Sequence, residues 1–193
     1  MGQYYLPIIR RTTAKGRTRN ESIYSWDFHN GLKLMEHSWV GNNFVNIICN
    51  DIIDKPARII WLGDYTETYD APEGFPRDKY RTLMKCWSRQ KSTKRFITKG
   101  NQEFDWNKQW FLVNSSKKCY VDMKNYIEDA TAEGWCIHPL PLLTCSSNGK
   151  GGGDYHSWNM SDVGSWCNDI IYLTTKRPIE YSEEEYFFRE EGV

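Results

Sequence analysis

The distribution of apolar residues along the chain predicts short strands and amphipathic helices. Apolar runs of strand length occur at Gln3–Ile9 and Arg58–Leu62, and the second is typical of a buried central strand. Pro7 has no amide hydrogen to donate, so we expect the first strand at a sheet edge. Apolar positions recur with helical spacing over Gly31–Asp54, where Asn42 is placed to cap a helix that follows it.

Two further apolar runs predict a hairpin that leads into a helix. Trp110–Val113 and Cys119–Asp122 flank a polar turn. The carboxylate of Asp122 can accept hydrogen bonds from the free amides at the start of a helix. We therefore expect a helix over Met123–Ala132 that stops at Gly134.

The remaining segments complete an α+β pattern. Asp78–Gln90 has the apolar spacing of a helix. Trp135–Thr144 contains two prolines and is expected to be extended, with Gly164–Leu173 as its partner strand. The chain is therefore predicted to form a single α+β domain over residues 1–193, with a mixed or mainly antiparallel sheet and about three helices.

Two polar segments are predicted to lie outside the core. Arg10–Asn20 carries five basic residues and is expected to be a hairpin tip or a mobile basic loop. Residues 178–193 carry six glutamates against one arginine, which indicates an acidic C-terminal tail. Neither segment has the composition of a linker between domains.

Composition narrows the class of protein. The 25 basic and 25 acidic residues balance, which argues against a surface tuned throughout to nucleic acid. No apolar run is long enough to cross a bilayer and no secretory signal is visible, so we expect a cytoplasmic protein without membrane contact. The six cysteines show no CxxC spacing, and neither a metal site nor a cofactor is predicted. Reduced thiols that pack as small hydrophobic groups are expected instead.

Positive charge is concentrated in one part of the chain. Arg77–Lys118 carries twelve basic residues against three acidic ones. Aromatic residues such as Trp87 and Trp106 are interleaved with them, a pattern that suits phosphate contacts and base stacking. A solvated helix face balanced by the acidic tail explains the same charges, as does an intramolecular or dimer contact with that tail. We favour the solvated face, so direct nucleic-acid binding is not the preferred prediction, and a homo-oligomer remains open.

A glycine-rich loop is the strongest single signal for a site. Residues 147–155 read SNGKGGGDY, and successive glycines expose backbone amides that can surround a phosphate. The pattern is neither a Walker A loop nor a Rossmann turn. A hairpin loop that requires positive φ explains the same glycines. The predicted ligand-binding residues are Asn148, Lys150, Gly151, Gly152, Gly153, Asp154, Tyr155 and Trp158.

Three residues are weaker candidates for acid–base catalysis. In a strand, His156 would share a face with Asp154. His37 lies in a helix-like segment, where a packed histidine is the commoner role. Asp64 follows a probable strand, a position where α/β sheets bind ligands. No nucleophile can be tied to these residues, so we favour a protein that is not an enzyme.

Four motifs carry a resemblance to a known family. They are MGQYY at the N-terminus, KLMEHSWVGN at 33–42, WLGDY at 61–65, and HPLPLLT with NGKGGGDY over 138–155. With these motifs the chain resembles, over most of its length, a family of small uncharacterised proteins of bacteria and their phages that has no established activity. Segments 10–20 and 77–107 depart from the family pattern. The resemblance implies an intracellular protein of phage origin that acts in the host cytoplasm, a class that often counters host defence.

Three functions agree with these signals. The preferred one is a binding protein that counters host defence, either by sequestering a nucleotide-like phosphate ligand in the glycine loop or by occluding a host defence protein. The first alternative is a small hydrolase or phosphodiesterase that uses His156, His37 and Asp64. The second is an inhibitor of a host nucleic-acid enzyme that binds through the basic segment.

Overall fold

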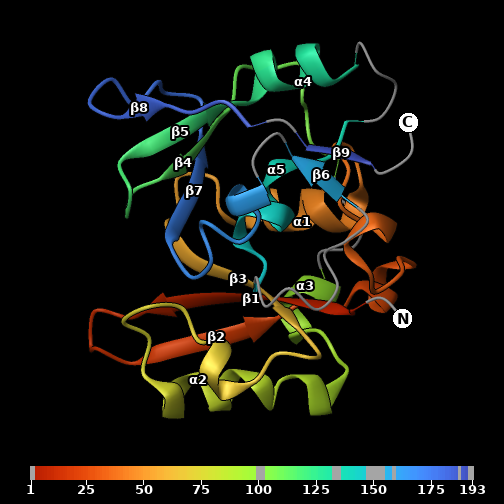
Figure 1. Cartoon of the computed structure of the whole chain (residues 1–193), viewed down its shortest axis with the longest axis vertical. Helices are drawn as coiled ribbons and strands as arrows, with labels where there is room; N and C mark the ends of the chain where they lie inside the picture. The colour runs from red at the N-terminus through yellow and green to blue at the C-terminus, as the bar shows by residue number, and fades with distance from the viewer. Residues whose placement is uncertain are drawn as a thin grey trace.

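A seven-stranded sheet forms the frame of the protein (Figure 1). The computed structural model describes residues 3–98, 103–131, 136–146, 155–157, 160–186 and 188–190, with the backbone course only for 130, 131, 155–157, 160, 189 and 190. The strand order is β2-β1-β3-β7-β4-β5-β8, and only the β5–β8 pairing is parallel. The prediction of a mixed, mainly antiparallel sheet in an α+β fold is therefore confirmed.

The strands are β1 (Tyr5–Thr12), β2 (Thr18–Ser22), β3 (Ala57–Gly63), β4 (Phe111–Asn114), β5 (Cys119–Asp122), β7 (Ile170–Thr174) and β8 (Ser182–Glu183), while β6 (Tyr155–Ser157) and β9 (Phe188–Glu190) form a separate pair.

Three longer helices and two short ones accompany the sheet in the described part of the chain. They are α1 (Asn43–Asp51), α2 (Arg77–Met84), α3 (Lys94–Ile97), α4 (Met123–Thr131) and α5 (Pro139–Thr144). Single 3-10 turns are η1 (Ser25–Phe28), η2 (Leu34–Glu36), η3 (Thr68–Asp70), η4 (Trp87–Arg89) and η5 (Met160–Asp162). Among these described helices, none has the length and apolarity needed to cross a membrane.

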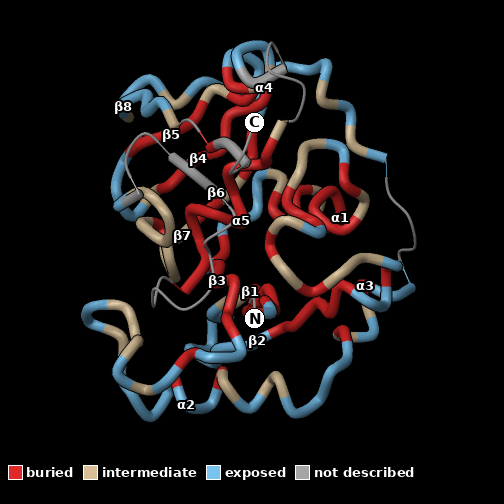
Figure 2. Tube along the Cα trace, turned by 45° about the vertical axis from the view of Figure 1, so that its right-hand side comes forward, coloured by how far each residue is buried: buried red, intermediate tan, exposed pale blue. Residues whose placement is uncertain are grey.

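The paired strands β1 and β3 separate two apolar layers. Alternate residues of a strand point to opposite faces of the sheet. Ile9 and its partner Ile59 enter the main core, which also contains the apolar residues of α1 and α5. Ile8 and its partner Ile60 enter a smaller cluster beneath α2. Figure 2 shows β1, β3 and α1 as buried, whereas α2 is largely exposed on its outer side.

Two caps and the central strand agree with the sequence-based predictions. The side chain of Asn42 accepts a hydrogen bond from the amide of Phe44 at 2.8 Å, at the start of α1. Asp122 Oδ1 accepts from the amide of Lys124 at 3.0 Å, at the start of α4. Strand β3 lies inside the sheet, and its apolar residues are buried on both faces.

The predicted edge position of the first strand is wrong. Strand β1 lies between β2 and β3. The pairing of β1 with β2 runs from Ile8↔Ser22 to Thr12↔Thr18, so Pro7 lies just beyond it. The carbonyl of Pro7 still accepts from the amide of Ile23 at 3.0 Å. Pro7 and Ile23 are the next pair in this register and share only that one bond, so the missing amide hydrogen falls at the last position of the ladder.

The two polar segments contain more regular structure than predicted. Within Arg10–Asn20, the first three residues belong to β1 and the last three to β2, which leaves a tight tip closed by the bond from Gly16 N to Thr13 O at 2.8 Å. In the acidic tail, β8 pairs with β5 and β9 pairs with β6. Strand β8 therefore lies at the sheet edge opposite β2, far from α2 (Figure 1).

The expected extended course of Trp135–Thr144 is also wrong for its described part. Residues Pro139–Thr144 form α5, and His138 caps it, because its Nδ1 accepts from the amide of Leu140 at 3.1 Å. Proline suits the first turn of a helix, where its missing amide has no partner to lose. The partner strand predicted over Gly164–Leu173 begins only at Ile170. The helix predicted over Asp78–Gln90 ends at Met84, and the turn η4 follows it.

A cluster of four charged side chains joins α3 to β1, β2 and α1. Arg95 pairs with both Glu21 and Asp51, and Arg11 also pairs with Asp51, at 2.8 Å. Both carboxylates are almost fully buried, at 4% and 5% exposed. Burial alone would raise the pKa of Asp51, but the hydrogen bonds and charges of the two arginines bring it down to about 2. The cluster fixes the basic segment onto the sheet.

We predict that Arg95→Met lowers the free energy of unfolding by about 3 kcal/mol, because it leaves two buried carboxylates short of a partner while Arg11 and Arg19 still hold one each. Urea denaturation measures this difference. Lys94→Met, at the exposed neighbouring position, is the matched control and should change stability by less than about 0.5 kcal/mol. Equal losses in the two variants would contradict this role of Arg95.

Candidate anion-binding site

Most of the predicted glycine-loop site lies outside the described residues. This applies to Asn148, Lys150, Gly151, Gly152, Gly153, Asp154 and Trp158. Tyr155 and His156 belong to β6, which pairs with β9 so that His156 lies opposite Arg189. The glycine loop therefore remains a prediction.

His37 is a structural residue of the core. Its side chain is fully buried, its Nδ1 lies 3.0 Å from the carbonyl oxygen of Gly31, and its Nε2 accepts from the indole N–H of Trp61 at 3.0 Å. This pairing requires a neutral ring with the proton on Nδ1. Burial lowers the pKa of His37 to about 4, against a weaker opposing effect of the Gly31 carbonyl. Both ring nitrogens are occupied, so the ring has none left for a substrate.

Asp64 lies at the surface and is not joined to His37. Its Oδ1 accepts from the amide of Tyr4 at 3.0 Å, and its own amide donates to the carbonyl of Tyr4 at 2.9 Å. No hydrogen bond links Asp64 to His37 within the described part of the chain. The structure thus does not assemble the catalytic group that the hydrolase alternative requires from these two residues.

Sequence reasoning missed a buried pair formed by His138 and Cys49. His138 Nε2 lies 3.5 Å from the sulfur of Cys49, and both side chains are inaccessible to solvent. Because Nδ1 already accepts from Leu140, the Nε2 hydrogen points at the sulfur. Burial lowers the pKa of His138 to about 3 and raises that of Cys49 above its usual range. The pair therefore lacks the thiolate that a nucleophile needs.

The described residues offer no metal centre: no three side chains among their histidines, cysteines, aspartates and glutamates are grouped closely enough to hold an ion. All six cysteines are free thiols.

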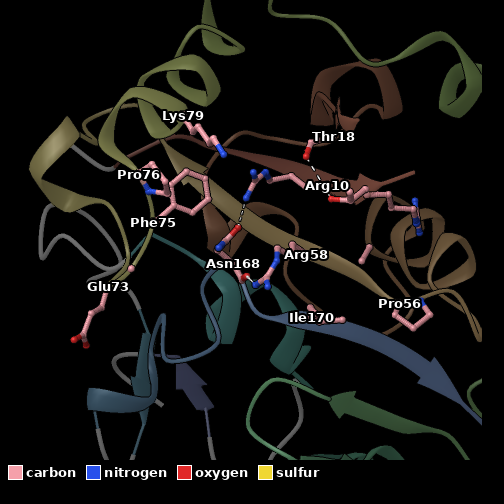
Figure 3. A pocket seen from close by; sticks show the side chains of 14 residues that line it. Arg10, Thr18, Pro56, Arg58, Glu73, Phe75, Pro76, Lys79, Asn168 and Ile170 are labelled. Carbon is pink, nitrogen blue, oxygen red and sulfur yellow. Dashed lines mark hydrogen bonds between the residues drawn. The ribbon is translucent and has the colours of Figure 1, made fainter. Parts of the chain in front are cut away.

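A cleft lined by cationic side chains opens where β1, β3 and the loop before α2 meet (Figure 3). We call it the basic cleft. It encloses about 680 Å³. Four cationic side chains line it, together with a single carboxylate and the residues Asn168, Phe75 and Thr18 among others. The cations are Arg10, Arg11, Arg58 and Lys79.

The centre of the basic cleft is a cross-strand pair of arginines. Arg10 of β1 and Arg58 of β3 are direct partners in the antiparallel register. Direct partners have Cβ atoms only about 5 Å apart, and like charges in this relation are destabilising. Burial and then the charge of Arg58 lower the pKa of Arg10. The fold therefore holds two positive charges together against their mutual repulsion.

Asn168 orients both guanidinium groups. Its Oδ1 accepts from Arg10 Nη1 at 2.5 Å, and its backbone carbonyl accepts from Arg58 Nη1 at 2.9 Å. Asn168 can do this because it adopts a left-handed conformation, with φ of 65°, and is anchored by its amide to the carbonyl of Ile59 at 2.8 Å. The ring of Phe75 packs against Arg10, with the guanidinium carbon 4.5 Å from the ring centroid. The cationic groups are thus positioned before any ligand arrives.

Among the described residues, Arg10, Arg58 and Lys79 form no ion pair with a carboxylate. This contrasts with Arg11, whose charge is taken up by Asp51. Glu73 lines the basic cleft, but its carboxylate points away from the arginine pair in Figure 3. The site presents unneutralised positive charge on oriented donors, which is the arrangement that binds anions.

Comparisons with protein-family models, with curated proteins and with solved structures give no match for this chain. The chemistry of the site therefore rests on its own residues.

We predict that the protein loses stability on mild acidification. His37 and His138 are neutral when folded and have a pKa near 6.5 when unfolded, so the unfolded state binds more protons below that pH. The stabilisation is complete above about pH 6.5 and falls toward pH 4, by up to about 1.4 kcal/mol per pH unit for each histidine. Urea denaturation at a series of pH values from about 7.5 to about 4.5 measures the free energy of unfolding and its loss. A free energy of unfolding that stays constant over this range would contradict the buried neutral state.

Proposed function

We propose that the protein is a binding protein for a phosphate-bearing ligand of the nucleotide class, and that the basic cleft holds the phosphates. The observation that carries the proposal is the direct cross-strand pairing of Arg10 with Arg58, without a carboxylate on either among the described residues. Such a pair costs stability in the free protein. An anion between the two groups removes that cost, so binding gains both the new contacts and the relief of repulsion.

The geometry favours phosphate over a single carboxylate. Each guanidinium presents several N–H donors in a planar fork that matches phosphate oxygens, and two such forks with Lys79 nearby suit an anion with more than one negative charge. The volume of about 680 Å³ is in the range of small-molecule sites. A diphosphate or a nucleotide meets both conditions.

Binding without catalysis is the better reading of the basic cleft. The lining residues include neither histidine nor cysteine, and the only carboxylate among them, that of Glu73, points away from the arginines. General acid–base catalysis needs a titratable group within hydrogen-bonding reach of the reacting atoms. The small hydrolase is therefore the less supported alternative. The resemblance to phage proteins extends the proposal to a role in the host cytoplasm, where sequestering a nucleotide signal would counter host defence.

We predict that Arg58→Ala weakens the binding of pyrophosphate and of ADP at least tenfold, since it removes one of the two opposed forks. Isothermal titration calorimetry at low ionic strength measures the affinity. The free energy of unfolding should stay within about 1 kcal/mol of the wild-type value, because the lost hydrogen bond to Asn168 and the relieved repulsion from Arg10 oppose each other.

Arg17→Ala is the matched control, since Arg17 is exposed at the hairpin tip and does not line the basic cleft. It should bind both probes as the wild type does. The proposal would be wrong if neither pyrophosphate nor ADP bound the wild-type protein, or if both variants lost affinity equally.

A further inference from the structure

A second hollow lies at the other end of β1 from the basic cleft, and we call it the aromatic groove. It encloses about 820 Å³. Four aromatic side chains line it, together with two acidic residues, Asp64 and Glu36, and one basic residue, Lys33. The aromatic residues are Tyr4, Tyr24, Trp26 and Trp87.

The aromatic groove leaves large ring surface open to solvent. Trp26 is 63% exposed and Tyr4 is 42% exposed, and among the tryptophans whose side chains the structure describes only Trp26 is exposed. The rings of Tyr24 and Trp26 lie 6.2 Å apart at an angle of 48°, so they do not stack fully on each other. Exposed rings that converge on a hollow are available to stack on a flat ligand.

The aromatic groove lies just before the first residue of β1, and the basic cleft lies near the other end of that strand. Tyr4 immediately precedes β1 and exchanges two hydrogen bonds with Asp64, and it is six residues from Arg10 along the chain. This separation corresponds to about 20 Å at about 3.4 Å per residue. Segment α2–η4 runs between the two hollows, since Lys79 lines the basic cleft and Trp87 lines the aromatic groove.

The segment between the hollows is strongly positive. Over residues 77–98 the chain carries eight basic residues and one acidic residue. Of the eight, only Arg95 has an ion pair with a carboxylate within the described residues. Among the described residues of the acidic tail, none pairs with these cations: β8 lies at the opposite edge of the sheet, and Glu183 pairs with Arg177. The exposed cations include Lys79, Arg81, Lys85 and Arg89.

We propose that the ligand is a single strand of nucleic acid, whose phosphates occupy the basic cleft and follow α2–η4 while its bases stack in the aromatic groove. The inference rests on the proposed function, because it extends the phosphate site of Arg10 and Arg58. A positive track that ends in exposed aromatic rings is the arrangement by which proteins hold single strands. A span of about 20 Å is longer than a mononucleotide can bridge but fits the range of about 4–16 nucleotides known for such sites.

The two carboxylates give the aromatic groove a different preference from the basic cleft. Asp64 Oδ1 accepts from the amide of Tyr4, and Glu36 Oε2 accepts from the amide of Lys33 at 3.0 Å. The two carboxylates outnumber the single cation, Lys33, among the lining residues, and this net negative charge disfavours a phosphate there. A carboxylate oxygen can instead accept a hydrogen bond from the amino group of a base such as cytosine. The bound nucleic acid is therefore expected to place its bases, and not its phosphates, in the aromatic groove.

The test compares three probes: pyrophosphate, ADP, and a labelled oligodeoxycytidylate of about twelve nucleotides. Calorimetry follows the first two and fluorescence anisotropy the third, on the full-length protein and its variants. We expect the oligonucleotide to bind at least tenfold more tightly than ADP. Trp26→Ala should weaken oligonucleotide binding about five- to hundredfold, the value of one stacked base, and leave pyrophosphate binding unchanged. Tyr69→Ala, at an exposed ring that does not line the aromatic groove, is the matched control.

Salt dependence separates the two parts of the site. In a plot of log affinity against log salt, Arg58→Ala should reduce the slope of oligonucleotide binding by about 0.7, the value of one phosphate contact on a single strand, whereas Trp26→Ala should leave the slope unchanged. If the oligonucleotide binds no tighter than ADP, or if Trp26→Ala binds it as the wild type does, this inference is overturned while the phosphate site stands. If pyrophosphate and ADP fail to bind at all, the proposed function itself fails.

Discussion

The antiparallel register of β1 with β3 is the constraint on which the rest of the structure depends. It places Ile9 opposite Ile59 on one face and Ile8 opposite Ile60 on the other, so one strand pair supports both apolar layers. The same register continues to Arg10 and Arg58. A slip by one residue would move every side chain of β1 to the opposite face. The burial of the isoleucines therefore enforces the meeting of two positive charges that would otherwise separate.

The structure compensates for this repulsion without cancelling it. Asn168 accepts a hydrogen bond from each arginine, and Phe75 packs against one of them. Neither contact supplies negative charge. By comparison, Arg95 and Arg11 are joined to buried carboxylates that neutralise them. Arg11 and Arg95 thus have ion pairs that stabilise the fold. Arg10 and Arg58 have only neutral partners among the described residues, so their charges are available to a ligand.

The sequence predicted the elements whose signals are local. The caps at Asn42 and Asp122 and the apolar strand around Ile60 needed only neighbouring residues to be recognised. The two prolines of this segment favour extended chain, so the sequence pattern does not predict helix α5. Pro139 nevertheless occupies the first helical turn, where its missing amide costs nothing. The edge position expected from Pro7 is wrong for a related reason, since only the extent of the pairing with β2 shows that Pro7 lies at its end.

The candidate site was beyond prediction because it depends on pairing between distant residues. Arg10 was placed in a polar loop and Arg58 at the start of an apolar strand, and nothing local connects them. The burial of His37, a candidate catalyst in the sequence, likewise became visible only when Trp61 and Gly31 were found on either side of its ring. Asp64 was rightly placed at the end of a strand, and it lines the aromatic groove without a catalytic partner among the described residues.

If Arg10 and Arg58 form one anion site, a bound anion should change the surroundings of both guanidinium groups. The Nε–H signals of the arginine side chains, followed in nitrogen-resolved NMR spectra during titration with pyrophosphate, report this change. We predict that the signals of Arg10 and Arg58 shift together with a single dissociation constant, while that of the control residue Arg17 does not move. Signals of Arg10 and Arg58 that stay in place while pyrophosphate binds elsewhere, or that do not shift at any concentration, would contradict it.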